Sequence, residues 1–250
     1  MGETRLRVYL FEGSNACLTC TLMLGHKRLA YERVDLPPAL HALIVRALGF
    51  PRTTVPAMWI GDRRVQGTLD ISAALDREFP DEPLYPSDPA ARSRVREAEV
   101  WGEKLQNACR RIFYAAARRD HRVFPAFISR GGLSAATAWA VRAATPLIIR
   151  VAIVGHGASD ERARRDLERL PDNLDRIDAY LASDVLGGER LNAADYQIAP
   201  NVRAMLQFAD LAPLVDGRPA AAWSMRVVPA YGRPVGAALP DDWIRPLRRR

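Results

Sequence analysis

A serine and two cysteines follow the first strand-like run of the chain, in the stretch LFEGSNACLTC at residues 10–20. Ser14 stands just before a predicted helix, and Cys17 and Cys20 have the spacing Cys-x-x-Cys. A hydroxyl that hydrogen-bonds an anion stabilises it by roughly 1.5–3 kcal/mol, and a helix N-terminus adds about 0.3–1 kcal/mol within its first turn. A Cys-x-x-Cys pair is instead typical of thiol–disulfide chemistry. The stretch therefore predicts either a serine that stabilises an anionic ligand or a redox-active cysteine.

The helix that carries these residues belongs to an alternating pattern over about 80 residues. Strands are predicted at 5–11, at 29–36 and, as two short runs about a Gly-Asp turn, within 56–67; helices are predicted at 17–28, 39–49 and 68–79. Thr68 is the expected N-cap of the last helix, because a threonine oxygen can accept from the free N–H groups there. The order strand-helix-strand-helix-strand-strand-helix predicts one mixed sheet with helices on its faces.

The rest of the chain has helical periodicity only. The segment FPDEPLYPSDPAA contains four prolines, which cannot continue a helix or pair inside a sheet, and so predicts a linker. Helices are predicted beyond it at 89–119, about 134–155, 160–183 with an interruption at Pro171, 193–208 and about 219–229. Asn192 and Asp195 have capping-box spacing, which indicates a folding element rather than a catalytic one. We therefore expect a domain at 1–82, a linker at 83–89 and an all-helical domain at 90–246.

Composition narrows the possible partners. No run of roughly 18 apolar residues occurs, so no membrane span is expected. Three cysteines form no even disulfide framework, which favours a cytoplasmic protein. The net charge is +7, but acidic residues alternate with the basic ones along the helical stretches, and only the tail RPLRRR is a pure basic block. This distribution argues against nucleic-acid binding and favours a positive field that attracts anionic ligands.

Three segments resemble motifs of the cytosolic glutathione transferases. The stretch TTVPAMWIGDRRVQGTLDI (53–71) resembles the family's Val-Pro strand-turn-strand segment, RLNAADYQIAP (190–200) its capping box, and GRPAAAWSMRVVP (217–229) its late Pro-x-x-x-Trp-x-x-Arg stretch. The chain thus resembles a bacterial glutathione transferase of the Ser or Cys type, with no subclass assigned. The resemblance implies a thioredoxin-like βαβαββα N-terminal domain, an all-α C-terminal domain and a detoxification enzyme that conjugates glutathione to a small hydrophobic electrophile.

The same resemblance implies a glutathione-binding surface. Its candidate residues are Asn15, Thr54, Val55, Pro56, Gly67 and Thr68. The Val55-Pro56 bond would be cis and would turn the Val55 backbone toward the tripeptide, and the γ-glutamyl carboxylate would bind at Thr68, where a helix begins. The sequence departs from the family at Thr54, where a lysine is common, and at Gly67, where Glu or Gln is common. Arg52 or Arg64 could replace the missing contacts, and another low-molecular-weight thiol could replace glutathione.

The resemblance also places the catalytic residue. When KRLAYE (27–32) is matched to the family's KGLxYE motif, the position that activates the thiol falls on Ser14, with Asn15 as a second donor. Cys17 then takes the place of the second cysteine of a redox pair and is the alternative catalytic residue. Cys20 lies two turns into the helix and is expected in the core.

Three functions therefore remain open: a glutathione transferase that uses Ser14, a thiol oxidoreductase that uses Cys17, and a transferase-like protein that binds ligands without catalysis. The electrophile would bind between the domains, beside a stripe of the first long helix. Its members are Trp101, Leu105, Cys109, Ile112 and Phe113, and a stripe of this kind is more often core than pocket. We expect a homodimer, and no metal or cofactor besides the thiol cosubstrate.

Overall fold

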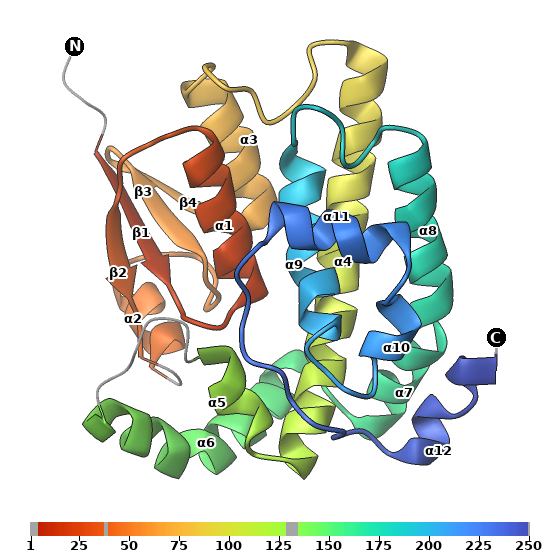
Figure 1. The fold of residues 1–250 in the computed structure, drawn as a ribbon. Helices are drawn as coiled ribbons and strands as arrows, with labels where there is room; N and C mark the ends of the chain where they lie inside the picture. Colours follow the sequence, from red (N-terminus) through yellow and green to blue (C-terminus); the bar gives the residue numbers. More distant parts are fainter. Residues whose placement is uncertain (1–4, 38–39, 129–134, 250) are drawn as a thin grey trace.

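Four strands near the N-terminus form one mixed sheet in the order β2-β1-β3-β4 (Figure 1). The computed structural model describes residues 5–37, 40–128 and 135–249. The strands are β1 (Leu6–Leu10), β2 (Glu32–Asp35), β3 (Ala57–Ile60) and β4 (Arg63–Gln66), and the helices among them are α1 (Asn15–His26), α2 (His41–Ala47) and α3 (Thr68–Glu78). β2 runs parallel to β1, whereas β3 is antiparallel to β1 and β4. The predicted βαβαββα order is confirmed.

Alternate side chains of β1 enter two different cores, because successive residues of a strand point to opposite faces. Val8 and Leu10 are buried in the core that contains α1 and α3, whereas Tyr9 is buried on the other face with Val45 of α2. The helices α1 and α3 lie between the sheet and the rest of the protein (Figure 1). The N-terminus of α1, which follows β1, therefore lies at the border between the two domains.

The remaining described chain is mostly helical, as predicted. Its helices are α4 (Pro89–Arg119), α5 (Val123–Ile128), α6 (Ala135–His156), α7 (Asp160–Glu168), α8 (Leu170–Ala182), α9 (Ala193–Met205), α10 (Ala212–Val215), α11 (Pro219–Val227), α12 (Asp241–Ile244) and a 3-10 turn at Leu247–Arg249. α4 and α9 pack against each other in its interior (Figure 1). They approach closely at Gly102. A Cβ atom there would lie 2.7 Å from Ile198 Cγ1, so a larger residue would force the two helices apart.

One hydrophobic core continues from α1 and α3 into α4 and α9. Polar contacts reinforce it along α1. Thr19 Oγ1 donates a 2.8 Å hydrogen bond to the Tyr196 carbonyl, and the Tyr196 hydroxyl lies 2.9 Å from His26 Nδ1. Just past the helix, Lys27 Nζ donates to three backbone carbonyls of residues 79–82 at 2.6–3.1 Å. The helical domain and residues 79–82 therefore hold α1 from Thr19 to its C-cap.

Two caps test the sequence predictions of helix ends. The Asn192–Asp195 capping box is confirmed: Asn192 Oδ1 accepts from the Asp195 N–H, and the Asp195 carboxylate accepts from the Asn192 N–H at 2.8 Å. The prediction that Thr68 caps α3 was wrong, because Gly67 is the N-cap and Thr68 is the first helical residue. Gly67 has φ 89°, a conformation that glycine adopts without strain.

Pro171 interrupts the helical region of 160–183, as predicted. α7 ends at Glu168, and Pro171 lies in the first turn of α8, where its missing N–H would have no partner in any case. The helices α5, α10 and α12 were not predicted. Each has only four to six residues, too few for an apolar periodicity to repeat.

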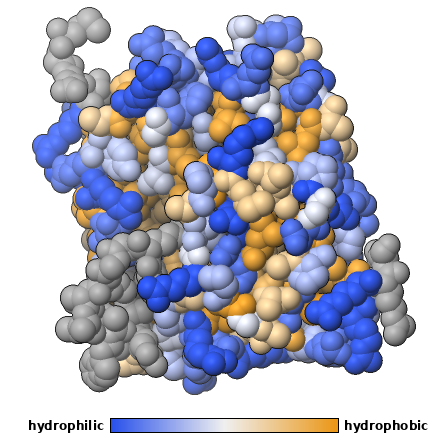
Figure 2. Space-filling view, viewed as in Figure 1, coloured by the Kyte–Doolittle hydropathy of each residue, from blue (hydrophilic) through white to orange (hydrophobic). Residues whose placement is uncertain are grey.

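Hydrophilic residues lie along the edge of the face shown in Figure 2, and hydrophobic residues are exposed toward its middle. No helix in the described ranges has both the length and the apolar character that crossing a membrane requires.

Candidate functional site

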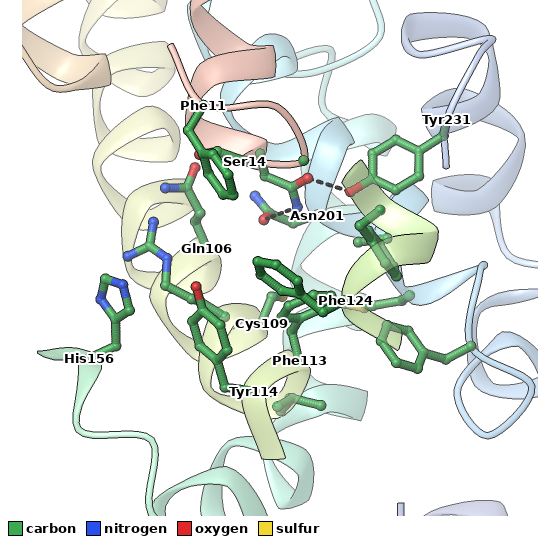
Figure 3. Close-up of a pocket in the computed structure, with 18 of the residues that line it drawn as sticks. Phe11, Ser14, Gln106, Cys109, Phe113, Tyr114, Phe124, His156, Asn201 and Tyr231 are labelled. Carbon is green, nitrogen blue, oxygen red and sulfur yellow. Dashed lines mark hydrogen bonds between the residues drawn. The ribbon is translucent and has the colours of Figure 1, made fainter. Parts of the chain in front are cut away.

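Ser14 stands at the start of α1 and borders a cavity between the two domains. Its backbone is extended and its Oγ accepts a hydrogen bond from the Cys17 N–H at 3.4 Å, which makes it the N-cap of the helix. Figure 3 shows Ser14 beside Phe11 at one end of this cavity. A ligand atom at this end would meet a hydroxyl and the positive end of a helix dipole, an arrangement that stabilises an anion.

The cavity is formed by segments far apart in the chain. Its walls come from the β1–α1 loop, α2, the loop before β3, α4, α5, the end of α6, α9 and the segment after α11. The lining residues from the N-terminal domain are Phe11, Gly13, Ser14, Asn15, His41, Thr54 and Val55. The structure thus brings the predicted residues Ser14, Asn15, Thr54 and Val55 to one cavity.

Cys17 and Cys20 are closed off from solvent inside α1. Cys17 is 4% exposed, and its Sγ accepts a hydrogen bond from the Phe11 N–H at 3.3 Å. Burial raises the pKa of the Cys17 thiol to about 11, despite opposing hydrogen bonds from Phe11 and Ser14, and burial also raises the pKa of Cys20. Both thiols are therefore protonated at neutral pH, and a protonated thiol is a poor nucleophile.

The side chain of Asn15 forms hydrogen bonds with the helical domain. Its Nδ2 donates to the Pro200 carbonyl at 3.2 Å and to Asn201 Oδ1 at 3.1 Å, and its Oδ1 accepts from the Tyr231 hydroxyl. Figure 3 shows Asn201 and Tyr231 converging on this point from two different segments. Both side-chain N–H groups of Asn15 therefore donate within the protein. The role of Asn15 as a donor to a ligand stays a prediction.

The Val55-Pro56 peptide is cis, as predicted. Gln66, on β4, fixes the loop that leads to it: its Nε2 donates to the carbonyls of Arg52 at 2.8 Å and Thr54 at 2.6 Å, and its Oε1 accepts from the Arg52 N–H at 2.9 Å. This role of Gln66 was not predicted from the sequence. The only local signal is that the glutamine stands next to the Gly67-Thr68 pair, and that signal is weak.

The start of α3 lacks a side-chain cap. Thr68 is buried, and the cavity described above does not reach it. Arg52 lies against Gly67, where its guanidinium would be 3.3 Å from an added Cβ, and it pairs with Asp70 in the first turn at 2.5 Å. Arg64 instead donates to the Leu48 carbonyl and stacks over Trp59. Of the two arginines considered as replacements, only Arg52 lies at the start of α3.

The predicted electrophile stripe of α4 divides into pocket and core. Cys109, Ile112 and Phe113 line the cavity, whereas Leu105 is buried in the core and Trp101 packs edge-on against Tyr180 of α8. Burial, with the charge of Asp166, raises the pKa of the Cys109 thiol to about 12. This cysteine therefore contributes an apolar wall rather than a thiolate.

A group of polar residues that also lines the cavity was not predicted. They are His41, Gln106, Arg110, Tyr114 and His156, and no local motif marks them because three separate helices, α2, α4 and α6, contribute them. His156 stacks on the Tyr114 ring with centroids 5.6 Å apart. Burial, assisted by the charge of Arg110, lowers the pKa of His156 to about 4.

Comparison with known proteins agrees with this geometry. Residues 8–83 match the family model of the glutathione S-transferase N-terminal domain. No curated protein matches the sequence. A glutathione S-transferase from Rhodospirillum rubrum is 20% identical, with a TM-score of 0.60 over 97% of this chain and 91% of the other.

Two further solved structures share the fold. A beta-etherase from Sphingobium is 18% identical, with a TM-score of 0.60 over 88% of this chain and 98% of the other. A glutathione S-transferase from Methylobacterium radiotolerans, solved in complex with glutathione sulfonate, is 20% identical, with a TM-score of 0.51 over 95% of this chain and 100% of the other. At these identities the likeness concerns the fold.

Proposed function

We propose that Ser14 activates the thiol of bound glutathione. The proposal starts from the match of residues 8–83 to the glutathione S-transferase N-terminal domain family and from the glutathione S-transferase fold of the chain. The thiolate then attacks an electrophilic carbon of the second substrate. A sulfur–carbon bond forms, the thiol proton passes to solvent, and the leaving group departs with the bonding electron pair, or an activated double bond takes up a proton instead. The observation that carries this proposal is the position of Ser14, at a helix N-terminus on the edge of an interdomain cavity.

The magnitude required is within reach of such a site. Lowering a thiol pKa by about two units takes ~2.7 kcal/mol at 1.36 kcal/mol per unit. A hydroxyl hydrogen bond to a thiolate contributes roughly 1.5–3 kcal/mol, and the start of α1 adds about 0.3–1 kcal/mol. These two contributions together match the requirement.

Glutathione would extend from Ser14 past the Val55 backbone toward the start of α3. The first turn of α3, which has no side-chain cap, supports this direction. The relative solved with glutathione sulfonate supports glutathione as the thiol. Arg52, with Gln66, would hold this surface in place of the residues that the family commonly has at positions 54 and 67.

The test is the Ser14→Ala variant with Ser159→Ala as its matched control. Ser159 is also an N-cap whose oxygen accepts from a backbone N–H, at 3.3 Å, but it begins α7 and is exposed. With 1-chloro-2,4-dinitrobenzene as the electrophile, Ser14→Ala should lower kcat roughly 10- to 100-fold because one charge-assisted hydrogen bond is lost. The ultraviolet thiolate absorbance of bound glutathione should fall in parallel, and Ser159→Ala should change neither.

Two results would favour the other functions. A Ser14→Ala variant at full rate, with an inactive Cys17→Ser variant, would identify a thiol oxidoreductase or a cysteine-dependent transferase. Wild-type protein that binds glutathione but conjugates no electrophile would identify a transferase-like binding protein.

A further inference from the structure

A cationic group lies on the α4 side of the interdomain cavity, apart from Ser14. Gln106, Arg110 and Tyr114 follow one another at intervals of four residues, which places them on one face of the helix, and all three line the cavity. Figure 3 shows Gln106 and Tyr114 on α4 pointing into the cavity, with Gln106 near Phe11 and His156 beside Tyr114. Arg110 lies between them along the helix.

The charge of Arg110 is not neutralised by the described parts of the protein. Its Nη1 donates to Asn107 Oδ1, a neutral acceptor, at 2.8 Å, and no ion pair with a carboxylate is found for it among the described residues. The neighbouring Arg111, by contrast, pairs with Asp166 through two hydrogen bonds of 2.5 and 3.0 Å. Burial lowers the pKa of Arg110, and a guanidinium in these surroundings stays protonated. A partly buried cation without a carboxylate partner costs solvation energy that an anionic ligand would recover.

Two imidazoles accompany this cation. His41 stacks on Phe11 with centroids 5.9 Å apart, and its Nδ1 is buried and has no hydrogen-bond partner among the described residues. His156 stacks on Tyr114. Burial lowers the pKa of both histidines, so both are neutral near pH 7. A single permanent positive charge with neutral donors suits a monoanion such as a carboxylate, whereas a phosphate dianion would require more cations.

Aromatic rings line the same cavity as Arg110 and Ser14. Phe113 contacts Phe127 with ring centroids 4.9 Å apart, and Phe127 contacts Phe208 at 5.6 Å; these three rings and Phe124 line the cavity. Figure 3 shows Phe113 and Phe124 in the middle of the site. Such walls favour a flat ring, which can pack against them in stacked or edge-on geometry.

We infer that the second substrate is an aromatic carboxylate: its ring packs among Phe113, Phe124 and Phe127, and its carboxylate binds the Arg110 guanidinium. The inference rests on the proposed function, since it places the electrophilic carbon of the ring toward Ser14. The binding of an aromatic carboxylate at Arg110 does not itself depend on the proposed function. Arg110 is then a specificity-determining residue that contacts the substrate.

The direct test is calorimetric binding of an unreactive pair, 4-nitrobenzoate and its neutral amide, 4-nitrobenzamide. Wild-type protein should bind the benzoate roughly 10- to 100-fold more tightly than the amide, because only the benzoate makes a charge-assisted bidentate contact. Arg110→Met keeps the length and apolar volume of the side chain and should abolish this preference. Arg94→Met is the matched control, because Arg94 is exposed on the same helix, outside the cavity, and its loss removes the same charge.

Several results would overturn the inference. They are a wild-type protein that does not distinguish the two compounds, an Arg110→Met variant that keeps the preference, or an Arg94→Met variant that loses it equally. If Arg110→Met does not fold, the wild-type comparison together with Arg110→Gln decides the matter.

The glutathione carboxylates are the other anions that Arg110 could bind, and kinetics separates them. With 4-chloro-3-nitrobenzoate as the electrophile, Arg110→Met should raise the KM for the benzoate and leave the KM for glutathione unchanged. A higher KM for glutathione with an unchanged KM for the benzoate would assign Arg110 to the thiol and refute the inference. Tight benzoate binding without conjugation of any electrophile would refute the proposed function and leave the carboxylate site standing.

Discussion

Glu99 should make the stability of this protein depend on pH in a direction opposite to that of most carboxylates. It lies on α4 with 0% exposure, and its two carboxylate oxygens accept from Ser72 Oγ at 2.5 Å and from the Tyr85 hydroxyl at 2.7 Å. Arg96 lies 3.8 Å away, at the edge of the cluster. Burial raises the pKa of Glu99 from 4.5 to about 7, and the hydrogen bonds from Ser72 and Tyr85 only partly oppose this.

The sign follows from proton binding. Between about pH 4.5 and 7 the folded protein keeps the proton of Glu99 whereas the unfolded chain has lost it. The free energy of unfolding must therefore fall as the pH rises through this window and level off above pH 7. The difference between 7 and 4.5, at 1.36 kcal/mol per unit, gives about 3 kcal/mol as an order of magnitude.

Urea unfolding at about pH 5, 6, 7 and 8 measures this contribution when Glu99→Gln is compared with wild type. Glutamine does not titrate, so only the wild type should lose stability as the pH rises. The difference in the free energy of unfolding, variant minus wild type, should therefore increase by about 3 kcal/mol from low to high pH. Glu97→Gln is the control, because Glu97 is an exposed residue on the same helix that pairs with Arg176 at 3.3 Å. A difference that stays constant with pH would mean that Glu99 is ionised throughout and would refute the reasoning.

Three further predictions concern the site and the assembly. Thr68→Val should raise the KM for glutathione several-fold with little change in kcat, because the γ-glutamyl carboxylate loses one hydrogen bond; an unchanged KM in steady-state kinetics would mean that backbone N–H groups alone hold it. Cys17→Ser should keep nearly full transferase rate, since burial raises the pKa of this thiol to about 11, and an inactive variant would reverse the assignment of Ser14. Sedimentation equilibrium in roughly 0.5–1 M salt should give the mass of a dimer, because an obligate interface of more than ~2,000 Å² is largely apolar and survives screening; a monomer mass would contradict it.

The fold could be predicted from the sequence because its elements have strong local signals. The apolar run Val8, Tyr9 and Leu10, with a β-branched and an aromatic residue, marks a strand, and the prolines before Pro89 mark a domain border, both without tertiary information. The position of Ser14 at the start of α1 followed from the same local pattern.

The group of polar residues around Arg110 could not be predicted in this way. His41, Arg110 and His156 come from three helices, and only the packing of those helices brings them to one cavity. Thr68 illustrates a smaller limit: threonine and glycine both cap helices, and only the positive φ of Gly67 decides which residue does so here.

The contacts along α1 constrain how the two halves of such a chain can be recombined in evolution. Asn15 binds the carbonyl of Pro200, Thr19 binds the carbonyl of Tyr196, and His26 meets the hydroxyl of Tyr196, so three successive levels of α1 fit one surface of α9. The orientation of the helix that presents Ser14 is thus encoded in the C-terminal half of the sequence as well as in the N-terminal half. The two halves are not exchangeable modules. A recombination event in the linker would bring in a foreign α9 and separate Ser14 from the residues that aim it, and so α1 and α9 must diverge together.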